Sequence, residues 1–139
     1  MTALLTLREL SPGDVLIEAT TPAVSRESLQ AYALASGDSN PLHLDPEFAR
    51  EAGFDDVIVH GMFGMARLGC LLCEELPVES IRGFSARFAA IIPVGQALHC
   101  RATLESRNAE SAMLALELSL PDGRVATRGT ATIALDVGD

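Results

Sequence analysis

The segment Gly37-Asp38-Ser39-Asn40-Pro41-Leu42-His43 carries a carboxylate and an imidazole five residues apart. Its Gly, Asn and Pro favour turns, so regular structure is not expected here. Pro41 restricts Asn40 to extended geometry, and the Asn40 amide can hold the loop in one shape. Two titratable groups held toward one small volume suit general acid–base chemistry. Asp38 and His43 are therefore candidate catalytic residues; the alternative is a turn aspartate near a surface histidine.

A second candidate lies in the run Val57-Ile58-Val59-His60-Gly61-Met62, where a β-prone stretch enters an apolar helix through a glycine. The first N–H groups of a helix lack internal partners and carry the positive end of its dipole. A backbone donor of this kind stabilises a developing oxyanion by about 3–4 kcal/mol. Gly61 is thus a candidate oxyanion donor, unless it only makes the turn. We expect His60 to be structural and His99 to face solvent.

Capping residues indicate the elements that position these groups. A strand is expected over residues 14–20, followed by a helix over about 26–36 that Ser25 caps and Gly37 ends. Asp45-Pro46 opens a short helix that ends near residue 52. The candidate acid–base segment therefore connects the end of one helix to the start of another.

The stretch 61–76 predicts the longest helix of the chain. It is apolar around nearly its whole circumference up to residue 73, so we expect other elements to surround it. Its length, roughly 24 Å at 1.5 Å per residue, suits a core helix and not a membrane span. Cys70 and Cys73 lie in this stretch and are expected to be buried thiols, because redox pairs favour helix N-termini and structural zinc needs four ligands.

The second half of the chain alternates between apolar and polar residues. Four such segments, over residues 84–90, 97–104, 112–120 and 125–135, are separated by turn residues. Consecutive segments of period two predict an antiparallel meander. We therefore predict one α+β domain over residues 1–139, with a strongly curved sheet wrapped around the long helix.

Composition narrows the function further. All ten basic residues are arginine, which excludes Schiff-base chemistry and a lysine-dependent phosphate loop. The net charge of −9 argues against a nucleic-acid partner. No apolar run is long enough for a membrane span, and no basic region precedes the first apolar stretch, so a cytoplasmic protein is expected. The apolar content of 48% suggests surface buried between subunits.

The sequence resembles a known family over these motifs. The residues that carry the resemblance are Tyr32 to Asp45, Phe48-Ala49 and Ile58 to Met62. Together they are similar to the signature of the MaoC-like (R)-specific enoyl-CoA hydratases, a group that includes the (3R)-hydroxyacyl-thioester dehydratases. The similarity is strongest over residues 32–62 and continues weakly to about residue 135.

This resemblance implies a hot-dog fold in which two subunits pair into one continuous sheet, with the active site near their interface. A homodimer is expected, although a heterodimer fits as well. Asp38 and His43 would be the catalytic pair, Gly61 the oxyanion donor, and Asn40 a supporting residue. The implied reaction is reversible syn hydration of a trans-2-enoyl thioester to a (3R)-3-hydroxyacyl thioester. The carrier would be coenzyme A or acyl carrier protein, with no metal and no other cofactor.

The chain departs from the family pattern at two positions. Gly69 stands where several of these hydratases carry a serine on the central helix, and Gln96 replaces an acidic residue. Arg67, the one charge within the apolar part of the helix, would pair with Asp55, Asp56 or a partner subunit, or else face the ligand channel.

An anionic carrier would need arginines on this acidic chain. Arg82 and Arg87 are the weak candidates for contacts with the phosphates of the thioester carrier.

Two other functions compete with hydration. A non-catalytic hot-dog subunit could serve only as the partner of an active one, but such a subunit need not retain both Asp38 and His43. Hot-dog thioesterases generally place a carboxylate on or near the central helix, and residues 61–73 contain none. The sequence therefore favours the hydratase.

Overall fold

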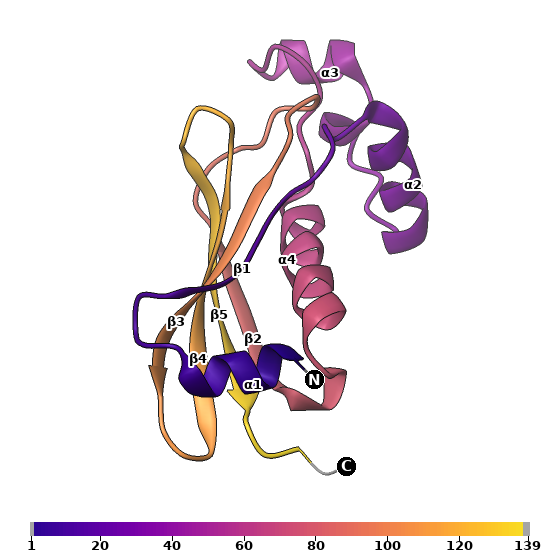
Figure 1. Cartoon of the computed structure of the whole chain (residues 1–139). Helices are drawn as coiled ribbons and strands as arrows, with labels where there is room; N and C mark the ends of the chain where they lie inside the picture. The colour runs from indigo at the N-terminus through magenta and orange to yellow at the C-terminus, as the bar shows by residue number, and fades with distance from the viewer. Residues whose placement is uncertain (1, 138–139) are drawn as a thin grey trace.

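The computed structural model describes residues 2–137 and places one long helix against one face of an antiparallel sheet (Figure 1). The sheet has five strands in the order β1-β3-β4-β5-β2, so β1 and β2 form its open edges. No helix within residues 2–137 is long and apolar enough to cross a membrane. The elements are α1 (Thr2–Glu9), β1 (Val15–Thr20), α2 (Arg26–Ser36), η1 (Pro41–His43), α3 (Pro46–Glu51), α4 (Gly61–Glu75), η2 (Val78–Ser80), β2 (Ile81–Phe88), β3 (His99–Arg107), β4 (Ser111–Ser119) and β5 (Val125–Ala134).

The core lies between α4 and the sheet. Every second residue of β4 is buried, and α4 contributes Gly64, Leu68 and Leu72 from one stripe. Leu4 and Leu7 of α1 belong to the same cluster. Helices α2 and α3 lie at the end of the molecule where α4 begins, and α1 lies toward the other end (Figure 1). The connections between α2, α3 and the start of α4 therefore meet at one place.

Capping chemistry placed the predicted helices correctly. The Ser25 side chain accepts a hydrogen bond from Ser28 N–H at the start of α2, and Gly37 ends this helix with φ 81°. The Asp45 side chain caps α3 by accepting from the N–H groups of Glu47 and Phe48. Each cap satisfies backbone groups that the helix itself leaves free, which is why these residues mark the boundaries.

The predicted order of the meander was wrong at its first segment. Strand β2 begins at Ile81 and pairs with β5, so only β3, β4 and β5 form a consecutive meander. The reason lies in the connection between β2 and β3, which crosses the sheet from the edge strand β2 to β3, the neighbour of the opposite edge strand β1. It is held beside the 57–60 segment by the bond from Val59 N–H to Ile92 O, 2.8 Å, and by an isolated bridge between Ile58 and Pro93.

Two local predictions also need correction. Helix α1 is not among the predicted elements, because the sequence was used there only to ask whether a signal peptide is present. The turn-rich acid–base segment contains regular structure, since residues Pro41–His43 form one 3-10 turn. Proline suits the first position of such a turn because its missing N–H has no partner there in any case.

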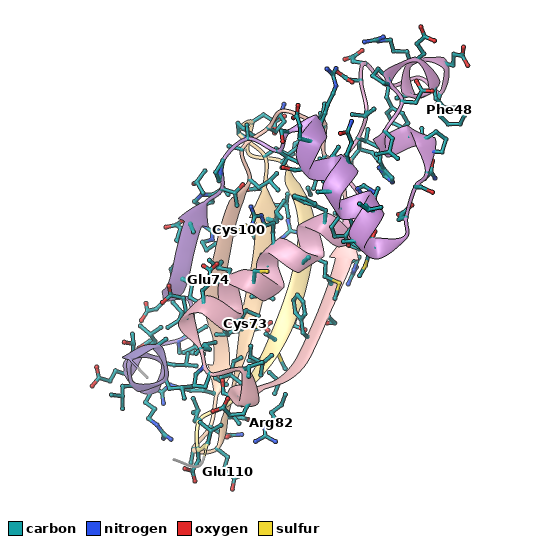
Figure 2. The ribbon with its side chains drawn as sticks, turned by 90° about the vertical axis from the view of Figure 1, so that its right-hand side faces the viewer. Phe48, Cys73, Glu74, Arg82, Cys100 and Glu110 are labelled. Carbon is teal, nitrogen blue, oxygen red and sulfur yellow. The ribbon has the colours of Figure 1, made fainter. Side chains whose placement is uncertain are left out.

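Helix α4 is covered on one side only. Met62 is 53% exposed, and Cys70 and Cys73 are exposed as well, so the prediction of a surrounded helix with buried thiols is wrong for this chain. Figure 2 shows Cys73 and Glu74 on α4. The buried thiol is Cys100 on β3, where burial raises the pKa to about 11.

Candidate active site

Asp38 lies directly after the left-handed Gly37 that ends α2. Its backbone N–H bonds the Ser36 hydroxyl at 3.2 Å, and its carboxylate accepts from Asn40 N–H at 3.3 Å. The side chain is exposed. The carboxylate is thus held by short-range bonds at the mouth of the loop and remains open to a ligand.

His43 ends the 3-10 turn, which Asn40 caps by accepting from Leu42 N–H at 3.0 Å. The His43 Nδ1 atom lies 2.7 Å from the carbonyl oxygen of Ile58. Because a carbonyl oxygen only accepts, Nδ1 carries the hydrogen and Nε2 of the neutral ring keeps a free lone pair. This arrangement presents Nε2 as a base.

The structure brings Asp38, His43 and His60 together. One carboxylate oxygen and one nitrogen from each ring all lie within 4.8 Å of one another. Asp38 is exposed, His43 is half-buried and His60 is buried. A carboxylate and a basic imidazole nitrogen at this separation can hold one water molecule between them and move protons to and from it.

His60 is buried, as expected, but its contacts go beyond a packing role. Its ring stacks on that of His43 with 3.8 Å between centroids, and Tyr32 packs edge-on against it at 4.8 Å. Its Nε2 lies 3.1 Å from the carbonyl oxygen of Asp38. Burial is the largest influence on the pKa of His60 and lowers it; the bond to the Asp38 carbonyl opposes this, and His43 lowers the pKa further. Burial therefore favours the neutral form of His60.

Gly61 is the first residue of α4, whose N-cap His60 makes no side-chain capping bond. Phe63 N–H donates to the carbonyl oxygen of His60 at 3.0 Å, whereas the N–H groups of Gly61 and Met62 have no hydrogen-bond acceptor among the described residues and are available to an oxyanion. A Cβ atom at position 61 would lie 3.0–3.1 Å from three ring atoms of Phe88. A side chain at position 61 would therefore press on the Phe88 ring of β2, a contact that the sequence did not reveal.

Gly69 has a similar neighbour. A Cβ atom there would lie 3.2 Å from the ring of Phe84, which is also on β2. The Phe84 ring therefore packs closely against this glycine.

Arg67 does not form the predicted ion pair, because the Asp56 carboxylate binds Arg26 instead. The Arg67 guanidinium lies 5.9 Å from the centre of the Phe63 ring. It lines a pocket of about 420 Å³ between α2 and α4, together with Ser28, Ala31, Tyr32, Phe63, Ala66 and Cys70. A pair with a partner subunit and a place beside a ligand channel both stay predictions for Arg67.

Arg82 and Arg87 are not brought to the cluster. Figure 2 shows Arg82 at the end of the molecule opposite to Phe48 of α3. Phe84 and Phe88 face α4, so the alternation of side chains along β2 directs Arg87 to the outer face of the sheet, where it lies opposite Arg128 of β5. Neither arginine contacts the acid–base groups.

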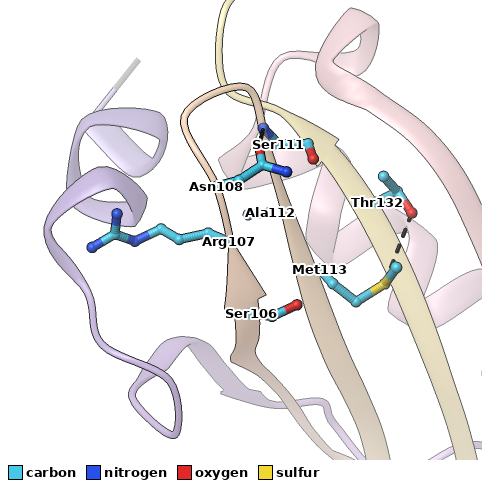
Figure 3. A pocket seen from close by; sticks show the side chains of 7 residues that line it. All are labelled: Ser106, Arg107, Asn108, Ser111, Ala112, Met113 and Thr132. Atoms are coloured by element: carbon cyan, nitrogen blue, oxygen red, sulfur yellow. Dashed lines mark hydrogen bonds between the residues drawn. The ribbon is translucent and has the colours of Figure 1, made fainter.

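The pocket at the far end of the sheet offers no comparable chemistry (Figure 3). It has a volume of about 220 Å³ and is lined by Ser106, Arg107, Asn108, Ser111, Ala112, Met113 and Thr132. This lining contains neither a carboxylate nor an imidazole. The Arg107 guanidinium donates two bonds to the carbonyl oxygen of Leu10, at 2.9 and 3.1 Å, and thereby fastens α1 to the sheet.

A metal centre fits the cluster less well than an acid–base pair. The two rings stack with 23° between their planes and 3.8 Å between their centroids, so their lone pairs lie in two separate, nearly parallel planes, which is unfavourable for tetrahedral binding of one ion. One nitrogen of each ring also bonds a carbonyl oxygen.

Comparison with known proteins agrees with this geometry. The sequence model of the MaoC-like domain family matches residues 10–117 of this chain. The chain belongs to the MaoC-like domain family. The matched range includes Asp38, His43, His60 and Gly61, and thus the whole candidate site of this MaoC-like domain.

Individual relatives support the assignment. The mitochondrial 3-hydroxyacyl-[acyl-carrier-protein] dehydratase of Arabidopsis thaliana is 45% identical over 92 residues, which cover 66% of this chain and 47% of the relative. The (R)-specific enoyl-CoA hydratase of Aeromonas caviae is 32% identical over 109 residues, covering 76% of this chain and 81% of that enzyme. The chain spans less than half the length of several curated relatives that it matches.

The fold of the MaoC-like domain is also that of solved hydratases. The structure of the (R)-hydratase from Aeromonas caviae involved in PHA biosynthesis superimposes with a TM-score of 0.81 at 28% identity, covering 93% of this chain and 99% of that one. The hot-dog prediction, a curved antiparallel sheet around a central helix, is thus confirmed; the sheet is open and not a closed barrel.

Proposed function

We propose that this MaoC-like domain catalyses the reversible hydration of a trans-2-enoyl thioester to a (3R)-3-hydroxyacyl thioester. The observation that carries the proposal is the cluster of Asp38 and His43, in which an oxygen of the exposed carboxylate lies within 4.8 Å of a nitrogen of the His43 ring. The hydratase and dehydratase relatives support it.

The chemistry requires one water and two proton transfers. Water lies between the Asp38 carboxylate and His43 Nε2, which together remove one of its protons as its oxygen bonds C3. A proton is delivered to C2 from the same side, which gives syn addition. The thioester oxygen gains charge in the transition state and is stabilised by the N–H of Gly61. Because the two groups share one water, their titration belongs to the pair.

Variants of the pair test the proposal. Loss of enoyl-thioester ultraviolet absorbance on crotonyl-CoA measures turnover, and chiral analysis of the product gives its configuration. We expect Asp38→Asn and His43→Gln each to lower kcat by about 10²–10⁴-fold. His99→Gln and Asp122→Asn are matched controls, since His99 bonds Thr20 and Glu18 of β1 and Asp122 bonds Arg124, all outside the acid–base cluster. A folded wild-type protein with no turnover, or a product of S configuration, would refute the proposal.

The competing functions have their own signatures. A thioesterase would release free thiol, which a thiol reagent detects, whereas hydration releases none. A non-catalytic subunit would show neither reaction alone.

No metal or redox group takes part in the proposed steps. We therefore expect activity to survive exhaustive treatment with a chelator. Loss of activity on chelation, with recovery on adding a divalent metal, would contradict this.

We further propose a homodimer that forms by pairing of the free β2 edges. Phe88 at the end of β2 is 50% exposed and Met62 at the start of α4 is 53% exposed, so a partner on this side would cover apolar surface beside the active site. We also propose that Arg67 contacts the carrier of the thioester, because its guanidinium lines the pocket between α2 and α4.

A further inference from the structure

His60 is the member of the cluster that the proposed reaction does not use. It is 1% exposed, and its Nδ1 is the one buried side-chain nitrogen or oxygen within residues 2–137 that has no hydrogen-bond partner. A phenyl ring would fill the same space without leaving a buried acceptor unpaired. Packing alone therefore gives no reason for an imidazole at this position.

The hydrogen bond of His60 Nε2 explains why an imidazole is present. The Asp38 carbonyl oxygen accepts from His60 Nε2 at 3.1 Å across 22 residues of sequence. The remaining bonds of Asp38 go to Ser36 and Asn40, within two residues. Ile58 binds the other end of this loop, at Leu42 and His43, so the bond from His60 ties the Asp38 end of the loop to the start of α4.

The face of the ring has a second contact. It stacks on His43 with centroids 3.8 Å apart, while the carbonyl oxygen of Ile58 fixes the edge of the His43 ring. Tyr32 packs against the His60 ring, which is therefore held by α2 as well. One side chain thus contacts both groups of the acid–base pair and adjoins the oxyanion donor.

We propose that His60 is a positioning residue, whose Nε2–H holds the Asp38 loop while its ring face supports His43, so that both groups keep a fixed separation above the start of α4. This role rests on the hydratase function proposed above. His60 contacts the two catalytic residues and does not touch the reacting atoms, so its effect passes through their geometry.

Two substitutions separate the bond from the ring. His60→Phe keeps a ring for stacking but loses the donor, and His60→Gln keeps an amide donor but loses the ring. If the bond to Asp38 dominates, His60→Phe lowers kcat by about 10²-fold with little change in KM, as misplacement by about 1 Å does. His60→Gln then recovers most of this loss.

Ser80→Ala is the matched control for a purely structural effect. Ser80 is also fully buried and donates from its side chain to a backbone carbonyl, that of Pro77, at the opposite end of α4. Thermal unfolding is measured for all variants. The proposal requires that His60→Phe lose kcat well beyond Ser80→Ala at a comparable Tm.

A readout independent of turnover keeps this inference apart from the proposed function. Nitrogen-15 spectra of the imidazoles report which nitrogen of His43 carries the hydrogen. We expect the Nδ1–H form in the wild type and a mixture of tautomers in His60→Phe. The proposal is overturned if the spectra of His43 are unchanged, or if kcat falls only in proportion to Tm as in Ser80→Ala. An inactive wild type with altered His43 spectra in His60→Phe would refute the hydratase alone.

Discussion

Two glycines of α4 lie beneath phenylalanine rings of β2. Replacing either glycine by alanine has two opposing effects on stability. Alanine is favoured over glycine inside a helix by about 0.5–1 kcal/mol. At position 69 the new Cβ would meet the Phe84 ring at 3.2 Å, which a shift of a few tenths of an ångström relieves.

We expect Gly61→Ala to reduce kcat at little cost in stability. Its Cβ would meet three atoms of the Phe88 ring at 3.0–3.1 Å, and this half-exposed ring must swing away from the oxyanion donor. Gly69→Ala is the matched variant, with a Tm close to wild type and a smaller effect on kcat. Steady-state kinetics and thermal unfolding of both variants test this prediction. Equal kcat values for Gly61→Ala and Gly69→Ala would show that the contact with Phe88 does not affect turnover.

His60 also predicts how stability depends on pH. Its pKa in the folded protein lies below the ordinary value of 6.5, so the unfolded chain binds more protons in the interval between these two values. Stability from this group is therefore fully present above pH 6.5 and is lost as the pH falls through the folded pKa. The slope is at most about 1.4 kcal/mol per pH unit.

Urea unfolding of wild type and His60→Phe at several pH values isolates this contribution. We expect the free energy of unfolding to fall less on acidification below about pH 6.5 in His60→Phe, because phenylalanine cannot bind a proton. Parallel pH profiles for the two proteins would contradict the buried neutral state of His60.

Asp38 and His43 could be singled out from the sequence because the caps and turn residues around them are local. The packing of Phe88 over Gly61 and the hydrogen bond from His60 to Asp38 could not be predicted, because these contacts join segments far apart in the chain. The stretch His60-Gly61 was singled out for its backbone, and its imidazole was assigned only a packing role. A histidine beside a candidate oxyanion glycine was the one signal available.

At the scale of elements, Gly129 of β5 leaves no room for a side chain beside the backbone of β2. A Cβ atom there would lie 2.3 Å from the carbonyl oxygen of Ser85 on β2, a distance that no side-chain movement can relieve. We expect Gly129→Ala to lower the free energy of unfolding by about 3 kcal/mol or more, measured in urea. Gly83→Ala is the control, because its Cβ would make ordinary contacts with Thr132 at 3.4–3.5 Å. Equal midpoints would contradict the approach of β2 to β5.

The pairing of β2 with β5 also shows which elements the sequence could predict. Helices α2 and α3 and the meander β3-β4-β5 follow from caps and alternation, which are local. The placement of β2 beside β5 depends on a crossing connection held by the backbone of residues 57–60. Alternation indicates that a segment is a strand but says nothing of its neighbour.

At the scale of the molecule, the free edge of β2 decides how copies can associate. Ala89 N–H donates to Ala126 O at 2.8 Å. Alternate residues of an antiparallel strand direct their N–H groups to the same neighbour, so those of Arg87 and Ser85 point to β5 and that of Ala86 points to the open edge. An unpaired edge of this kind is a template for a second strand.

Ala86→Pro therefore tests the proposed dimer without breaking the fold. Proline is tolerated on an edge strand where its missing N–H would face outward, so the pairing of β2 with β5 stays intact. We expect wild type to sediment at twice 14.7 kDa and Ala86→Pro to shift toward the monomer with an unchanged circular dichroism spectrum. Ala86→Ser retains the N–H group and should remain dimeric. A proline variant as dimeric as wild type would place the interface elsewhere, and a monomeric wild type would leave the apolar surface of α4 and β2 open to a different partner.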